Sequence, residues 1–267
     1  MQSTRLKNII ILILALLNLF LLGSLLSRQA AQLESRSRTA EQLTALFEAN
    51  NITLSQRAVT FDPPPEGASL SRDVDQERQL AAFLLGKGMT HSSQSSVIYS
   101  YESSAGAAVF SAGGAFEAAI LLNEDTDVER LCRQLCRQFQ YDDLTVSQEE
   151  PFSASATRTF DGYPVSNCTV TFSVQGSALT VSGTFLPAAA SSSDGETDSL
   201  DAVSALTAFL NAHLESGAVV SHVTGITACY QVQNTSASAM NLVPMWGIQT
   251  DFGEYYVNCY TGAVTRG

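Results

Sequence analysis

The side chains best suited to catalysis are few and scattered along this chain. The three histidines, His91, His213 and His222, lie in no H-E-x-x-H motif, which would place two imidazoles around a metal ion on one helix face. The sequence has no G-x-S-x-G or S-x-x-K arrangement for a nucleophilic serine. Asp251-Phe252-Gly253 matches the metal-binding tripeptide of protein kinases, but no H-R-D segment or strand lysine accompanies it. We therefore predict a turn there, no catalytic residue and no enzyme.

Phosphate and metal sites are also not predicted. Gly106, Gly113 and Gly114 do not form a phosphate-binding loop, because no lysine-bearing helix follows them. The five cysteines show no C-x-x-C or Cys/His spacing typical of zinc sites. We expect no cofactor and no bound metal.

The cysteines are odd in number, so at least one must stay free or pair between molecules. Cys132 and Cys136 lie one turn apart in a helical segment beside its apolar stripe, where we expect buried thiols. Cys229 and Cys259 lie in strand-like runs and are the one pair that we would test as a disulfide. The sequence leaves that pairing open.

The charge of the chain is strongly acidic. It has 14 basic and 26 acidic residues, which gives a formal net charge of −12. Two of the basic residues, Arg5 and Lys7, precede the long apolar run, so the remaining chain is still more acidic. Binding to nucleic acid requires clustered lysine and arginine to neutralise phosphates. The composition therefore excludes nucleic acid as an expected partner.

The N-terminal apolar run is the element most easily interpreted. Residues 9–26 are almost entirely apolar, and at about 1.5 Å per residue such a helix spans the bilayer core. A cleaved signal peptide is the alternative, but Arg28 or Gln29 would occupy the position that requires a small residue. We predict an uncleaved transmembrane anchor over residues 9–27, preceded by a cytoplasmic tail of residues 1–8.

One polar side chain interrupts the anchor. An amide in mid-membrane is disfavoured unless it is paired, and Asn18 shares a helix face with Ala15 and Leu22. We predict that these three residues contact a neighbouring transmembrane helix. The alternative is that Asn18 bonds only its own backbone.

The rest of the chain is lysine-poor, acidic and rich in Ser, Thr and Ala. Basic residues flank the apolar run on both sides and do not fix its orientation. The short N-terminal tail and the composition of the remainder favour a single-pass protein of the cell membrane, with its N-terminus in the cytoplasm and its C-terminal part extracytoplasmic.

Helical and strand-like patterns alternate after the anchor. Thr39-Ala40-Glu41-Gln42 and Thr126 with Glu129 have the form of capping boxes. The periodicity predicts helices that begin at Thr39 and end at Asn50-Asn51, and over Asp73–Lys87, Thr126–Gln140 and Leu200–Ser216. Strand-like runs with turn residues follow each of the last three helices, which begin near Asp73, Thr126 and Leu200.

We therefore predict an α+β fold in which modules of one helix pack on antiparallel β-meanders. The expected divisions are a membrane-proximal α+β region at residues 28–122, a helix-plus-meander module at 123–187, a linker at 188–199 and a C-terminal helix-plus-meander module at 200–267. The Ser-rich run at residues 92–96 is predicted as a loop.

Trp246 is the only tryptophan of the chain. Alternate residues of the run 255–260 should face the core, and Trp246 should pack on that set as a core residue. If it instead lies on the surface, it becomes a candidate contact for a partner.

Several short segments together resemble a known family. These are the basic start, the apolar helix with Asn-Leu-Phe-Leu-Leu at residues 18–22, the helix that closes at residues 46–54 and the proline cluster that follows. They are similar to the YycI/YycH regulatory proteins of Gram-positive bacteria. Residues 245–248 and 255–264 look like the final hairpin of that family and of PepSY-like modules.

The resemblance implies a function in a two-component regulatory system. Such a protein would associate with a sensor histidine kinase of the YycG (WalK) type, and with a second YycH/YycI-family protein, and would adjust signalling in cell-wall homeostasis. Two alternatives remain open: a PepSY-like inhibitor or chaperone of an exported protease, and an extracytoplasmic ligand-binding or envelope protein. A ligand-binding protein would have a deep apolar pocket with convergent polar groups.

Overall fold

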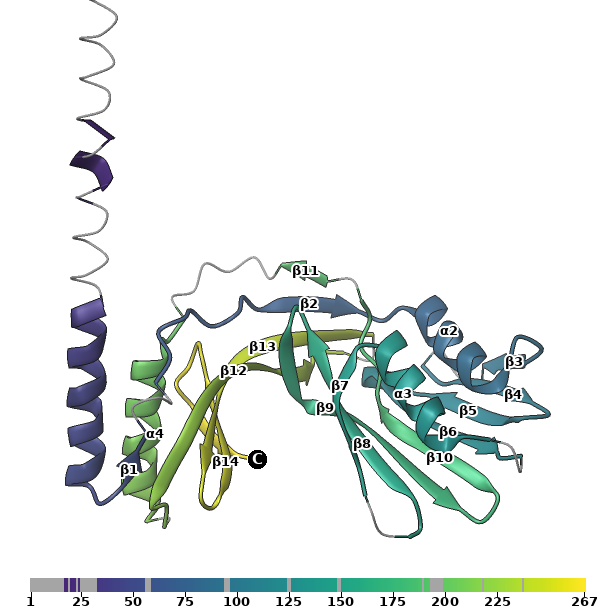
Figure 1. Cartoon of the computed structure of the whole chain (residues 1–267). Coiled ribbons are helices and arrows are strands. Elements are labelled where there is room, and N and C mark those ends of the chain that lie inside the picture. The colour runs from purple at the N-terminus through teal and green to yellow at the C-terminus, as the bar shows by residue number, and fades with distance from the viewer. Residues whose placement is uncertain are drawn as a thin grey trace, which may run out of the picture.

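The computed structural model describes residues 17–18, 20–22, 24, 33–55, 59–93, 97–123, 126–147, 150–188, 190–192, 199–217, 219–236 and 238–267. These residues form a mixed α+β fold with a large, mainly antiparallel sheet (Figure 1). Within these ranges no helix combines the length and the apolar character needed to cross a bilayer. The predicted tail 1–8 and most of the predicted anchor lie outside the described residues.

Three of the helices begin at aspartate caps. α2 (Val74–Leu85), α3 (Val128–Gln138) and α4 (Ala202–Ser216) follow Asp73, Asp127 and Asp201, whose carboxylates accept backbone N–H groups of the first turn. The predicted cap at Thr126 is therefore wrong by one residue. An ionised carboxylate is favoured at the positive end of a helix, and Asp127 takes this role.

The capping box predicted at Thr39 is also wrong. Residues 33–49 are helical, so Thr39 lies inside the helix, and its hydroxyl donates to the carbonyl of Ser35 at 3.0 Å. A threonine can satisfy its hydroxyl in this way within a helix. The expected end at Asn50-Asn51 is correct, since Asn51 has a left-handed φ of 61°.

In the described part of the chain, a helix followed by at least four strands occurs three times; after α3 a fifth strand, β11, follows as well. The first unit is α2, β3 (Thr90–Ser93), β4 (Tyr99–Ser103), β5 (Gly106–Phe110) and β6 (Ala115–Leu121), with a short 3₁₀ helix, η2 (Ala112–Gly114), before β6. The second is α3, β7 (Tyr141–Val146), β8 (Ser153–Phe160), β9 (Tyr163–Gln175) and β10 (Ala178–Thr184). The third is α4, β12 (His222–Asn234), β13 (Ala239–Thr250), β14 (Gly253–Asn258) and β15 (Val264–Arg266).

Within these three units, two strands differ from the sequence prediction. β3 includes Ser92 and Ser93, which were expected in a loop, and β7 lies where no strand was expected. All four residues of β3 are exposed. Both strands have one strand neighbour and lack the regular apolar alternation that identifies a half-buried strand.

Strand pairing joins the three units. β6 and β10 pair antiparallel and link the first unit to the second, whereas β9 and β12 meet at the single parallel pair Val165 and Tyr230. β1 (Thr53–Leu54) pairs with β12. β2 (Ala68–Ser71) pairs with β13, and β11 (Ala190–Ser192) pairs with β2, so the predicted linker 188–199 contains a short strand.

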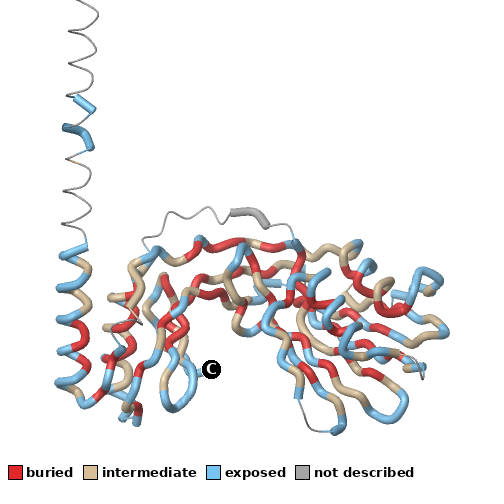
Figure 2. Tube along the Cα trace, viewed as in Figure 1, coloured by how far each residue is buried: buried red, intermediate tan, exposed pale blue. Residues whose placement is uncertain are grey.

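The buried residues form three clusters, and Figure 2 shows them recurring along the strands and the inner helix faces. One cluster lies where α2 and α3 cover β4–β6 and β8–β10. A second lies between α4 and β12–β14. The third lies between them, around β2, β9, β12 and β13. The apolar stripes of the helices and the alternation of the strands therefore face the same interior.

The helix of residues 33–49 packs against the second cluster, between α4 and β12–β14. Leu43 and Phe47 are 5% and 0% exposed and belong to the same cluster as Leu206 and Phe209 of α4. In Figure 1 this helix runs alongside α4. The segment that follows the N-terminal apolar run is thus part of the folded core.

Trp246 lies in this core and is 1% exposed. Its indole Nε1 donates a hydrogen bond of 2.8 Å to the carbonyl of Leu200, just before α4. Val257 and Cys259 are fully buried in the same cluster, and Tyr255 packs against it, so this alternate set faces inward as expected.

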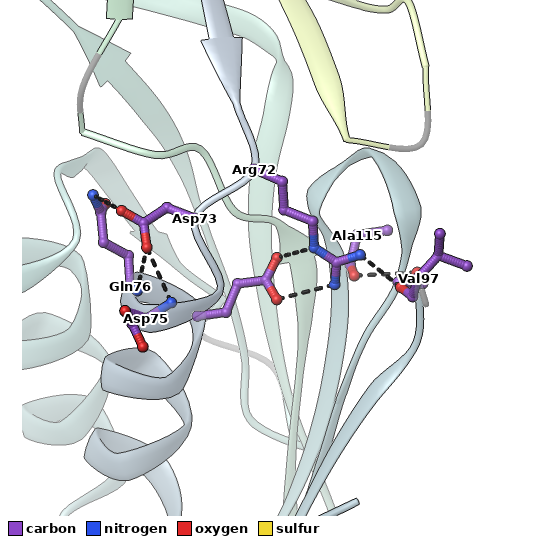
Figure 3. A network of polar contacts seen from close by, with 8 residues as sticks. Arg72, Asp73, Asp75, Gln76, Val97 and Ala115 are labelled. Atoms are coloured by element: carbon purple, nitrogen blue, oxygen red, sulfur yellow. Dashed lines mark hydrogen bonds and ion pairs between the residues drawn. The ribbon is translucent and has the colours of Figure 1, made fainter. Parts of the chain in front are cut away.

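A buried ion pair connects β2 to the first unit (Figure 3). The guanidinium of Arg72 donates to both carboxylate oxygens of Glu77, at 2.7 and 3.0 Å, and the two side chains are 7% and 1% exposed. Nη1 of Arg72 donates to the carbonyl of Val97 at 2.6 Å, and the guanidinium carbon lies 5.0 Å from the ring centroid of Tyr99. The charge of Arg72 is fully compensated within the protein.

Replacing Trp246 with alanine should lower the free energy of unfolding by about 3–5 kcal/mol, because a large core side chain is lost. Trp246→Phe keeps most of the volume but loses the hydrogen bond to Leu200, and should cost less. Denaturation of the full chain in detergent, followed by far-UV circular dichroism, measures both changes. An unchanged stability of Trp246→Ala would contradict the core role.

Replacing Glu77 with glutamine should lower the free energy of unfolding by about 3–5 kcal/mol, because it leaves the buried Arg72 without its counter-charge. Glu129→Gln is the matched control, since Glu129 pairs with Arg133 on the first turns of α3 with both side chains about half exposed. That change should cost no more than about 1 kcal/mol. Equal effects of the two variants in the same denaturation assay would refute the special role of the buried pair.

Candidate functional site

Arg158 occupies an unusual position on β8. Alternate residues of this strand face the interior, and Ala154, Ala156 and Phe160 are buried there. Arg158 continues that alternation and is 3% exposed. It lies between Ala156 of the first cluster and Phe160 of the third, so a charged side chain stands where two hydrophobic clusters meet.

The known contacts of the Arg158 guanidinium are all with neutral groups. Nη1 donates to the backbone carbonyl and to the side-chain Oε1 of Gln140, at 2.9 and 2.8 Å. The guanidinium carbon lies 5.9 Å from the ring centroid of Tyr141. Among the residues that the structure describes, no carboxylate forms an ion pair with Arg158.

Burial lowers the pKa of Arg158, since desolvation disfavours its charged form. An arginine nevertheless remains protonated in a protein. Gln140 adopts a left-handed φ of 56°, and its carbonyl also accepts the backbone N–H of Thr159 at 3.0 Å. Arg158 therefore holds the turn from α3 into β7 while keeping a positive charge inside the protein.

A pocket of about 300 Å³ opens beside this guanidinium. Its walls combine glutamine amides and one guanidinium with apolar side chains, from four parts of the chain: Gln76, Gln79, Gln138, Phe139, Gln140, Arg158, Phe185, Leu186 and Ala188. Gln76 is fixed, because its amide donates to Asp73 at 2.9 Å and accepts the backbone N–H of Ala188 at 2.9 Å. The pocket thus offers one buried cation, amide groups and an aromatic wall.

A second pocket, of about 340 Å³, lies between the strands of the second and third units. Tyr256 donates to Glu254 at 2.6 Å, and both side chains line this pocket together with Asp143. Burial and the Glu254 carboxylate raise the pKa of Tyr256. This pocket carries two carboxylates, Asp143 and Glu254, in a lining of mixed polarity.

A third, smaller pocket of about 210 Å³ lies between the C-terminal end of α4 and β15. His213 lines it, stacked on Phe209 with 6.0 Å between ring centroids. Its Nδ1 is buried, and no described group bonds to it. His91 and His222 lie on β3 and β12, so the fold does not bring the three histidines together.

The residues proposed from the anchor are only partly described. Asn18 and Leu22 are helical and exposed, whereas Ala15 lies outside the described residues. The structure therefore leaves the predicted three-residue face untested. Trp246, the other candidate, lies in the core.

The disulfide considered for Cys229 and Cys259 does not form. All five cysteines are free and buried. β13 lies between the two residues, because Cys229 pairs with Met245 and Met245 pairs with Asn258. Two strand spacings place the Cα atoms about 10 Å apart, beyond the roughly 7 Å that a disulfide tolerates.

Burial also makes these thiols unreactive. Desolvation raises the pKa of Cys132, Cys168, Cys229 and Cys259 to about 12 and that of Cys136 to about 11. The thiolate is the reactive form. The prediction of buried thiols at Cys132 and Cys136 is correct.

Sequence reasoning did not identify Arg158 as a site residue. The available signal was an arginine in register with Ala154, Ala156 and Phe160 on the inward face of one strand. A charged side chain on the apolar face of a strand is normally paired with an opposite charge or binds a ligand. The other walls of the pocket come from distant segments and have no common motif.

No protein-family model matches the chain, and no curated protein matches it. Solved structures include two weak structural neighbours. An uncharacterized protein from Eubacterium rectale ATCC 33656 has 11% identity and a TM-score of 0.45, over 81% of this chain and 90% of that protein. The C-terminal domain of Bacillus megaterium YpeB has 12% identity and a TM-score of 0.38, over 74% of this chain and 98% of that domain. These similarities do not assign the chain to a family.

Proposed function

We propose that this chain is a single-pass, membrane-anchored regulator without catalytic activity of its own. Its anchor would contact a sensor histidine kinase of the YycG (WalK) type, and its extracytoplasmic part would adjust kinase signalling in the cell-wall homeostasis of a Gram-positive bacterium. A second YycH/YycI-family protein is a further proposed partner. The proposal rests on the sequence resemblance and on how the helix of residues 33–49 is held.

The docking of that helix is the observation that carries the proposal. Leu43 and Phe47 are buried against α4, and β1, shortly after the helix, pairs with β12. A passive tether needs no buried contacts with the domain that it tethers. Because this helix follows the anchor segment in sequence, a change in the folded part can be transmitted towards the membrane.

Transmission of this kind can regulate a kinase only if the two signalling states bind the regulator with different affinity. The proposed orientation, with N-terminal residues 1–8 in the cytoplasm, places the folded units on the extracytoplasmic side. There these units, each with one helix packed on an antiparallel meander, would adjust the signalling of the kinase. The acidic composition agrees with a partner other than nucleic acid.

The third unit favours a second candidate function. It comprises α4 and β12–β15 and contains both C-terminal segments that resemble PepSY-like modules. In this case the chain would inhibit or assist an exported protease. Capture of a peptidase, in place of a kinase, by the full chain from solubilised membranes would distinguish this function from the first.

The kinase contact is tested by exchanging residues 1–27 for an unrelated transmembrane helix and, separately, by Asn18→Leu. Both variants should remain in the membrane fraction and co-purify less kinase, since a bond from Asn18 to a neighbouring helix contributes about 0.6–2 kcal/mol. Phe20→Leu is the matched control, because Phe20 lies about 200° around the helix from Asn18. If both variants bind the kinase as well as the parent does, the anchor is not the contact.

The coupling is tested by inserting a flexible Gly/Ser segment immediately before residue 33. The anchor and the folded part both remain, so we expect normal co-purification with the kinase but loss of the effect on kinase autophosphorylation in proteoliposomes. A regulator that acts equally well after the insertion would disprove transmission through this helix.

A further inference from the structure

We propose that the pocket at Arg158 binds the carboxylate of a small organic ligand. The guanidinium would hold the carboxylate, and Phe139 and Phe185 would contact the body of the ligand. This proposal concerns a site separate from the kinase contact and does not depend on it.

Among the described residues, the two arginines with buried side chains differ in their partners, and this difference supports a ligand at one of them. Arg72 has a bidentate carboxylate partner in Glu77, a carbonyl and an aromatic ring. Arg158 is buried to a similar degree, but within the described part of the chain only its Nη1 donates hydrogen bonds, both to Gln140. Buried charges in proteins are normally paired. The carboxylate of Asp142 acts on Arg158 electrostatically, but it accepts a hydrogen bond from Thr159 and forms no ion pair with the guanidinium. Arg158 therefore has no hydrogen-bonded anion among the described residues.

The geometry favours a carboxylate over other anions. Nε and Nη2 of Arg158 donate no hydrogen bond to a described group, and these parallel donors match the two oxygens of a carboxylate. No other cationic side chain lines the pocket among the described residues. One positive charge suits a ligand with one negative charge, whereas a phosphate would call for further cations.

The amides and the apolar wall define the rest of the ligand. Oε1 of Gln140 accepts from Arg158, which leaves its amide nitrogen to donate to a ligand oxygen. Gln79 and Gln138 also line the pocket. A volume of about 300 Å³ suits a small aromatic or aliphatic acid or the last residues of a peptide. Both sources present the same chemistry, a carboxylate on an apolar body.

A purely structural role is the competing explanation. Arg158 bonds the carbonyl that follows α3, where a cation is favoured by the negative end of the helix. Such a role predicts that loss of Arg158 lowers stability without any effect of added acids. Ligand binding must therefore be measured directly.

The test uses the full chain in detergent and isothermal titration calorimetry with 3-phenylpropanoate. We expect saturable binding, with at least tenfold weaker binding of the neutral 3-phenylpropanamide and of inorganic phosphate. N-acetyl-Ala-Phe with a free C-terminus is compared with its C-terminal amide. Tighter binding of the free peptide than of 3-phenylpropanoate identifies a peptide end as the source, and the reverse order identifies a small acid.

Variants connect binding to the pocket. Arg158→Lys keeps the charge but loses the fork of donors, and should weaken 3-phenylpropanoate binding at least tenfold. Gln138→Leu, which changes no described hydrogen bond, should weaken it severalfold and remains informative if Arg158 variants fold poorly. Arg137→Gln, an exposed arginine in the last turn of α3, is the control and should bind as the parent does.

Three results would overturn the proposal. They are equal binding of the acid and its amide, no binding of either 3-phenylpropanoate or the free peptide, and parental affinity in both Arg158→Lys and Gln138→Leu. Each would leave Arg158 as a cap for α3 alone.

Discussion

The ion pair of Arg72 and Glu77 fixes how the N-terminal and C-terminal parts of the chain meet. β2 pairs with β13, far along the sequence, and the next residue after β2 is Arg72. Because separating this buried pair would leave an uncompensated charge, the first turn of α2 is held at the end of β2. The bond to Val97 and the contact with Tyr99 hold the start of β4 to the same point. Units distant in sequence thus acquire one fixed arrangement.

This arrangement also builds the pocket at Arg158. Gln76, next to Glu77, bonds the backbone of Ala188 and lines the pocket, so the position of α2 determines one wall. Other lining residues come from the end of α3 and from β8. Arg72 and Arg158 therefore differ in their contacts: Arg72 has a charged partner within the protein, whereas Arg158 retains donors beside a pocket.

Local signals in the sequence predicted much of the fold. Helices α2 and α4 begin and end nearly where expected, after Asp73 and Asp201 and at Gly86 and Gly217. Caps and glycines with positive φ act over a few residues, so the sequence records them locally. β2, β3, β7 and β11 were not predicted, and of these β3 and β7 each pair with one strand only, so they need not show apolar alternation. The pairing of β2 with β13 and the walls around Arg158 depend on contacts between distant residues, which no single-sequence pattern records. The partner of Asn18, if it is another protein, cannot be found in one chain.

The buried thiols have a practical consequence, because their alkylation can show where the chain unfolds locally. At pH 7 a thiol with a pKa of about 11 is ionised in roughly one molecule in ten thousand, so reaction with an alkylating reagent requires exposure first. Cys136, Cys168 and Cys259 belong to three different clusters. The order in which they become labelled therefore tells which of the three cores separates from the others first.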